Sequence, residues 1–180
     1  MYSEISSPMD YHAALYIRLS KEDENEGPSQ SVTNQESLLR EFVRQQRLNV
    51  YDTYIDDGWS GTNFDRPDFQ RMIDHLAAQR VIADIEAKRV NMVITKDLSR
   101  LGRDYIMTGH YMERYFPEHR VRYISLLDGI DTGVDSTAND ITPFRAIMND
   151  MYAKDISKKI KSVKRDKQRR GLFIGGKPGY

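Results

Sequence analysis

Five residues of this chain could together perform chemistry on a phosphate ester. They are one serine and four arginines: Ser20, Arg18, Arg66, Arg100 and Arg103. Planar guanidinium groups match the oxygens of a phosphodiester, and four of them in one pocket would repel one another unless an anion sits there. A serine hydroxyl is a weak nucleophile that needs activation, while arginine can neutralise the charge that builds up during attack on phosphorus. If the fold brings them together, these residues suit attack on a nucleic-acid backbone without a divalent metal.

The spacing of these residues is compatible with one shared site, although each pair alone is weak evidence for it. Arg18 and Ser20 stand two positions apart and therefore share one face of an extended strand. Arg100 and Arg103 stand three apart and share a face if the turn that carries them is helical. A serine after a strand is commonly a cap or turn residue, and two nearby arginines are often solvated charges.

Other polar residues near these positions could help to order a pocket. Gln30 and Gln35 lie on an acidic loop and the following helix, where glutamine is ordinarily a surface residue. Asp57 and Ser60 are ordinary turn formers. Trp59 either packs within its loop or faces DNA, and both interpretations stay open. The general acid and the general base remain unassigned.

The sequence offers little for a metal or a cofactor. The chain has no cysteine, which excludes disulfides, a cysteine-based zinc site and a cysteine nucleophile, and is compatible with a reducing cytoplasm. The four histidines fall on separate predicted elements with no ligand spacing: His12, His75, His110 and His119. We therefore expect no metal and no cofactor.

Charge is divided unevenly along a chain that is neutral overall. Lys+Arg and Asp+Glu both number 27, but from Lys154 onward we count 10 basic and 2 acidic residues. A basic tail favours a polyanion partner, because lysine and arginine near phosphates release condensed counterions; a solvated helix face is the alternative. The mean hydropathy is −0.68 and no apolar run could span a membrane, so we expect a soluble, cytoplasmic protein.

Apolar periodicity predicts strands that alternate with helices. The expected strands are 12–19, 50–55, 91–95 and 121–127, and the expected helices are 31–48, 68–89, 104–118 and one that starts at 142. Alternation of this kind predicts an α/β fold with a mainly parallel central sheet and flanking helices. In such sheets sites gather at the carboxyl ends of the strands, where the polar candidates lie. We expect residues 128–140 to form a flexible loop.

The last predicted helix is longer than one small domain can cover. We expect it to project and to pair with another subunit, with packing on its own sheet as the alternative. The expected organisation is an α/β core at 1–140, a long interface helix at 141–170 and the start of a linker at 171–180, toward a missing DNA-binding domain.

Four ordered motifs resemble the catalytic domain of the serine recombinases, the resolvase and invertase family. They are YIRLS at 16–20, Gln30 with Gln35, DGWSG at 57–61 with DRP at 65–67, and SRLGRD at 99–104. The ending GGKPGY at 175–180 looks like the start of the next domain in the large serine recombinases, the integrase and transposase branch. Two residues depart from common family patterns: Ser99 stands where small resolvases commonly have Asp, and Asp155 where many members have Glu.

The resemblance implies site-specific recombination of double-stranded DNA through a covalent 5′-phosphoserine at Ser20. Arg18, Arg66, Arg100 and Arg103 would then bind the phosphate, and Gln30, Gln35, Asp57 and Ser60 would order the pocket. Family members work as homodimers that assemble into a tetramer, without a metal or ATP. The long helix would be the dimerisation helix and would reach across DNA.

Two other functions stay open at this stage. One is a non-catalytic DNA-binding or assembly module that keeps the fold. The other is a metal-free phosphoesterase that releases its product by hydrolysis.

Overall fold

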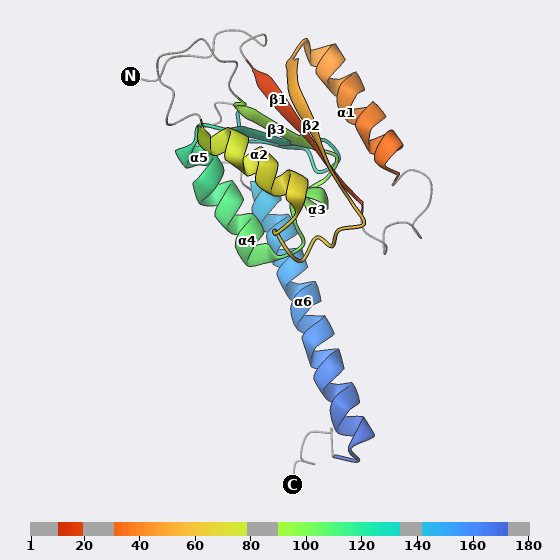
Figure 1. The fold of residues 1–180 in the computed structure, drawn as a ribbon. Coiled ribbons are helices and arrows are strands. Elements are labelled where there is room, and N and C mark those ends of the chain that lie inside the picture. Colours follow the sequence, from red (N-terminus) through yellow and green to blue (C-terminus); the bar gives the residue numbers. More distant parts are fainter. Residues whose placement is uncertain (1–10, 20–30, 79–89, 134–141, 173–180) are drawn as a thin grey trace.

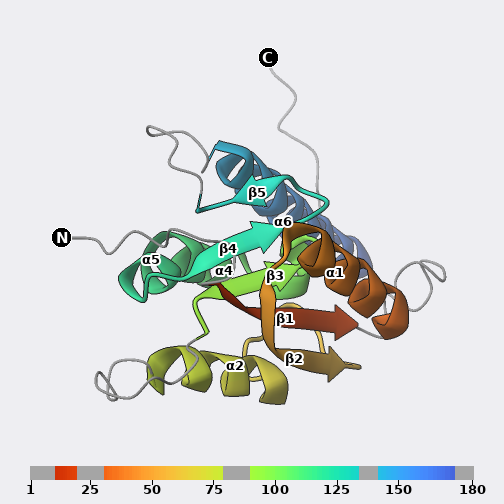
Figure 2. The same ribbon diagram turned by 90° about the horizontal axis from the view of Figure 1, so that it is seen from above.

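Five strands form one sheet at the centre of the computed structural model, which describes residues 11–19, 31–78, 90–133 and 142–172. The order across the sheet is β2-β1-β3-β4-β5 (Figure 2). The strands are β1 (His12–Leu19), β2 (Asn49–Asp57), β3 (Met92–Thr95), β4 (Arg122–Ser125) and β5 (Ile130–Asp131). The first four run parallel and β5 is antiparallel to β4. The predicted α/β fold with a mainly parallel sheet is confirmed.

The central strand β1 is buried on both faces, and its side chains alternate between two apolar clusters. Leu15 and Ile17 pack with Leu39 of α1, whereas Ala14 and Tyr16 belong to the cluster on the opposite face. Figure 1 shows α1 on one side of the sheet and α2, α4 and α5 on the other. These helices are α1 (Val32–Gln46), α2 (Pro67–Ala77), α4 (Tyr105–His110) and α5 (Phe116–Glu118), with a π-helical turn (Tyr111–Tyr115) joining the last two.

The parallel arrangement brings the carboxyl ends of β1, β2, β3 and β4 to one edge of the sheet. In the register of β1 and β2, Arg18 lies beside Asp56 and Leu19 beside Asp57. A short helix, α3 (Leu98–Leu101), follows β3 within three residues. Most of the candidate residues therefore come from this edge.

The strand β5 corrects the expectation of a flexible loop at 128–140. Ile130 is buried, and Arg122 donates two hydrogen bonds to the carboxylate of Asp131, at 2.7 and 2.6 Å. A two-residue strand carries no detectable alternation, so the sequence could not reveal it. Residues 134–141 of that expected loop lie outside the described residues.

The last helix, α6 (Thr142–Arg169), extends well beyond the α/β body (Figure 1). Phe144 near its start is buried in the core, whereas residues 161–170 are all exposed. Across the described parts of the chain, no helix combines the length and apolarity that a membrane span needs.

Candidate active site at the carboxyl ends of the sheet

The backbone carbonyl of Arg18 is the point where three elements meet. It accepts a hydrogen bond from Gln35 Nε2 of α1 at 3.2 Å and another from Arg100 Nη1 of α3 at 3.1 Å. Both donor side chains are almost fully buried. The end of β1 is thereby held between α1 and α3.

The Arg18 side chain connects β1 to the two loops beside it. Its Nη1 donates to the carbonyl of Trp59 at 2.9 Å, and its Nη2 donates to the carbonyl of Ser99 at 3.0 Å. The side chain is fully buried. Arg18 thus holds the loop after β2 and the start of α3 at the end of its own strand.

Arg100 and Arg103 differ in position more than their spacing suggested. The helix α3 ends at Leu101, and Gly102 continues in an extended conformation, so Arg103 lies beyond the helix instead of sharing a face with Arg100. Arg100 is 3% exposed, and its Nε donates to Asp97 Oδ2 at 3.4 Å. Arg103 is partly exposed and is the most accessible of the four candidate arginines.

The loop after β2 lies tightly against these arginines. The amide of Arg103 donates to the carbonyl of Gly61 at 2.6 Å. A Cβ at Gly61 would stand 2.9 Å from Arg103 Cγ and 3.1 Å from Arg18 Cζ, so a glycine is needed at this close approach. Within the loop, Ser60 Oγ bonds Thr62 Oγ1 at 2.9 Å, and Asp57 is exposed at the end of β2.

Arg66 is fully buried among aromatic rings at the start of α2. Its Nη1 and Nη2 donate to the carbonyls of Arg100, at 3.3 Å, and Leu101, at 2.6 Å. Burial lowers the pKa of the guanidinium, while the coulombic influence of Tyr16 and Asp56 raises it. Because arginine starts from a very high pKa, the group remains a cation that is held by carbonyls and ring faces.

Two of the candidate residues, Ser20 and Gln30, lie outside the described residues. The structure brings the other expected side chains to one edge of the sheet: Arg18, Gln35, Asp57, Ser60, Arg66, Arg100 and Arg103. Within the described ranges, no group of three or more His, Asp or Glu side chains is arranged to hold a metal ion.

Sequence reasoning missed Asp56, a buried carboxylate at this edge. Its Oδ2 accepts a hydrogen bond from Tyr16 Oη at 2.7 Å, and burial together with Asp56 raises the pKa of that phenol. The residue types of β2 gave no signal for it, because the apolar Ile55 is exposed whereas Tyr54 and Asp56 are buried. Asp57, the carboxylate predicted from the sequence, is the exposed last residue of β2.

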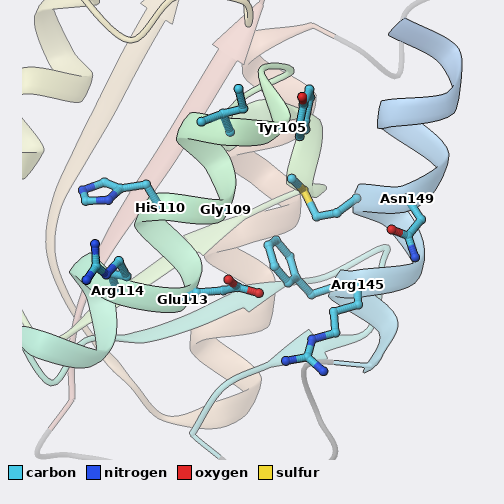
Figure 3. A pocket seen from close by; sticks show the side chains of 10 residues that line it. Tyr105, Gly109, His110, Glu113, Arg114, Arg145 and Asn149 are labelled. Atoms are coloured by element: carbon cyan, nitrogen blue, oxygen red, sulfur yellow. The ribbon is translucent and has the colours of Figure 1, made fainter. Parts of the chain in front are cut away.

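A groove of 440 Å³ between α4 and α6 is separate from this edge (Figure 3). Tyr105, His110 and Glu113 line it from α4 and the π-helical turn, and Arg145 and Asn149 line it from α6. None of the candidate residues is among those that line it. The groove belongs to the junction between the body and the long helix.

Comparison with known proteins identifies a family pattern across most of the chain. Residues 13–172 match the family described as "Resolvase, N terminal domain". A comparison with curated proteins gives no match.

Solved structures share the fold over most of this chain. The N-terminal catalytic domain of TP901-1 integrase is 24% identical with a TM-score of 0.58, over 82% of this chain and 96% of that one. A resolvase family site-specific recombinase from Streptococcus pneumoniae is 20% identical with a TM-score of 0.58, over 89% and 98% of the two chains. The C-terminal catalytic domain of ISC1926 TnpA, an IS607-like serine recombinase, is 18% identical with a TM-score of 0.51, over 84% and 82%.

Proposed function

We propose, from the premise that this chain belongs to the resolvase family of serine recombinases, that it cuts and rejoins double-stranded DNA at specific sites through a covalent bond to Ser20. The observation that carries the proposal is the meeting of α1, β1 and α3 at the carbonyl of Arg18. Only one residue separates Arg18 from Ser20, so the chain can extend at most about 7 Å between their Cα atoms. This short separation supports a role for Ser20 beside the arginine-rich edge.

The chemistry is a pair of phosphoryl transfers. In the first, Ser20 Oγ forms a bond to the phosphorus, the bond from phosphorus to the 3′ oxygen breaks, and the serine proton ends on that 3′ oxygen. The products are a 5′-phosphoserine and a free 3′-hydroxyl. In the second, a 3′-hydroxyl of the partner strand attacks the phosphoserine and returns the proton to Ser20. Each step exchanges one phosphate ester for another, so ATP is not needed.

The charge that builds on the phosphate oxygens needs preorganised donors. Arg103 is the most exposed of the four candidate arginines, and we assign it to direct contact with the phosphate. Arg18 and Arg100 hold the end of β1 beside the phosphate and supply positive charge to the phosphate. Gln35 helps to fix the Arg18 carbonyl, to which Arg100 also donates. Gln30, Asp57 and Ser60 complete the pocket in this proposal.

The polarity of the cut ends tests the proposed reaction. The substrate is the duplex that the full-length protein selects from a randomised double-stranded pool. We expect cleaved 5′ ends that stay attached to protein after denaturation and 3′ ends that a polymerase can extend. Free 5′-phosphates without any attached protein would indicate hydrolysis, and uncut bound duplex would indicate a binding module; either result would overturn the proposal.

The single tryptophan of the chain offers a direct report of where DNA lies. Trp59 is 40% exposed, and its carbonyl is held by Arg18 at the candidate site. We expect the selected duplex to quench the Trp59 emission, because bases stack on indole rings. Raising the salt from about 50 to 200 mM should restore the emission as phosphate contacts are lost. Emission that stays constant while anisotropy of labelled DNA shows binding would contradict contact at this edge.

The exposed apolar side chains of α6 predict a subunit interface. Ile156, Ile160 and Val163 share one helix face, and the last two are 50% and 55% exposed. Burying such side chains contributes about 1.5–3 kcal/mol each, so Ile160→Asp with Val163→Asp should weaken a homodimer by at least about 10²-fold. Sedimentation equilibrium measures this, with Ser162→Asp as the control on another face. An unchanged dimer in the double variant would contradict the assignment.

A further inference from the structure

Asp56 caps a helix to which it does not belong. Its Oδ1 accepts from the amide of Asp68 at 3.0 Å, and its Oδ2 accepts from the amide of Phe69 at 2.9 Å. These amides lie in the first turn of α2, where N–H groups have no partner within the helix and a carboxylate is favourable. The N-cap residue of α2, Arg66, makes no side-chain capping bond. Asp56 therefore supplies from β2 the cap that Arg66 does not provide.

Arg66 in turn caps the C-terminal end of α3. Its guanidinium donates to the carbonyls of Arg100 and Leu101, the last two residues of α3. Carbonyls at a helix end lack intrahelical partners, and a cation is favourable there. Removing the guanidinium would leave these buried carbonyls unsatisfied.

The surroundings of Arg66 leave it one orientation. The guanidinium carbon lies 4.7 Å from the ring centre of Phe69, 4.9 Å from that of Phe64 and 5.4 Å from that of Tyr16. The same Tyr16 donates its hydroxyl to Asp56. With no exposed surface, Arg66 could reach a phosphate only by leaving the carbonyls of α3 and the aromatic rings.

We propose that Asp56 and Arg66 form a relay of two helix caps that holds Arg100 against the end of β1. Asp56 fixes the start of α2, Arg66 extends from that start to the end of α3, and Arg100 extends from α3 to the carbonyl of Arg18. Arg66 is then a positioning residue that acts through Arg100 and does not touch the phosphate. The catalytic consequence rests on the proposed function; the structural linkage does not.

Amide exchange in the free protein tests the linkage without DNA. Asp56→Asn replaces one carboxylate oxygen by an NH2 group that faces a hydrogen-bond donor, so it should loosen the start of α2. Through Arg66, it should also speed exchange of the Gly102 amide at the end of α3, which donates to the Leu98 carbonyl, by about tenfold. Asp52→Asn is the matched control, because Asp52 lies on the same strand but pairs with Arg71 at the surface.

If Asp56→Asn does not fold, Tyr16→Phe removes one of the three hydrogen-bond donors to Asp56 and should speed exchange of the Gly102 amide by a smaller factor. An unchanged Gly102 amide in the folded variant would overturn the relay.

A double-mutant cycle on cleavage tests the catalytic part. Asp56→Asn and Arg66→Lys should each slow cleavage of the prebound selected duplex by at least about tenfold, because a displaced group can cost about 10²-fold, while Kd for the duplex stays within about twofold. Because both act on Arg100 in series, the double variant should be no slower than the slower single variant. Multiplying effects, or a raised Kd in Arg66→Lys, would show that Arg66 contacts the phosphate directly and would overturn the proposal.

The two experiments separate failure of the relay from failure of the proposed function. If the unmodified protein does not cleave DNA, the proposed function fails, and amide exchange alone decides the relay. If the protein cleaves but Gly102 and the cleavage rate are insensitive to Asp56, the relay fails and the recombinase assignment remains.

Discussion

Replacing Ser20 by alanine is expected to lower the rate of DNA cleavage by about 10⁴-fold or more, because removal of the nucleophile removes the covalent route. The serine hydroxyl carries no charge, so the affinity for DNA should change by less than about twofold. Single-turnover cleavage of the selected duplex at saturating protein measures the first quantity, and a binding titration measures the second.

The matched control for this variant is Ser37→Ala. Ser37 is exposed on α1 and belongs to no candidate site. It should cleave at the unmodified rate. A Ser20→Ala protein that still cleaves within about tenfold of the unmodified rate would show that another group attacks the phosphate.

Replacing Arg103 by alanine is expected to slow cleavage by about 10² to 10³-fold, the usual loss when one donor to a developing anion is removed. Arg103→Lys keeps the charge but loses the planar fork, so its rate should fall between those of the alanine variant and the unmodified protein. The same single-turnover assay measures both. The step affected is chemical, so the loss should persist at saturating protein.

The control is Arg44→Ala, which removes an exposed arginine of α1 paired with Glu41. Exposed pairs of this kind contribute about 0 to 1 kcal/mol, so neither stability nor cleavage should change measurably. Equal losses in the Arg103 and Arg44 variants would mean that general charge, and not contact at the site, explains the result.

The sequence predicted the fold because β1 and β3 are strongly apolar and the predicted strands alternate with segments of helical period. The bounds of β1 agree with the expected 12–19, since this central strand is buried on both faces and reads as one apolar run. The first helix was expected at 31–48 and occupies Val32–Gln46, ending where Arg47 adopts a left-handed conformation. The strand β5 was missed because two residues cannot show a period.

The arrangement of the arginines could be predicted only in part. Their motifs indicated that they gather at one edge, which the structure shows for the four of them. Their individual environments depend on tertiary contacts. Arg66 packs against Tyr16 of β1 as well as its sequence neighbours Phe64 and Phe69, and its guanidinium binds the end of α3. Arg103 falls outside α3 because Gly102 ends that helix. Spacing in the sequence does not encode such contacts, so four similar arginines proved to occupy four different settings.

The buried carboxylate of Asp56 was not predicted from the sequence as a site residue. Aspartate is rarely fully buried unless it is paired, so a polar strand end favoured an exposed assignment. Its partners lie in β1 and α2, at Tyr16 and at the amides of Asp68 and Phe69. Only the folded chain brings these three donors together.

The most direct test of the central claim is to identify the atom to which DNA becomes attached. The protein is incubated with the selected duplex, denatured and digested with protease and nuclease, and the nucleotide-bearing peptide is sequenced by mass spectrometry. We predict a single adduct, a 5′-phosphonucleotide on Ser20, that is missing from Ser20→Ala. An adduct on Ser60 or Ser99, or cleaved DNA with no adduct on any residue, would contradict the account.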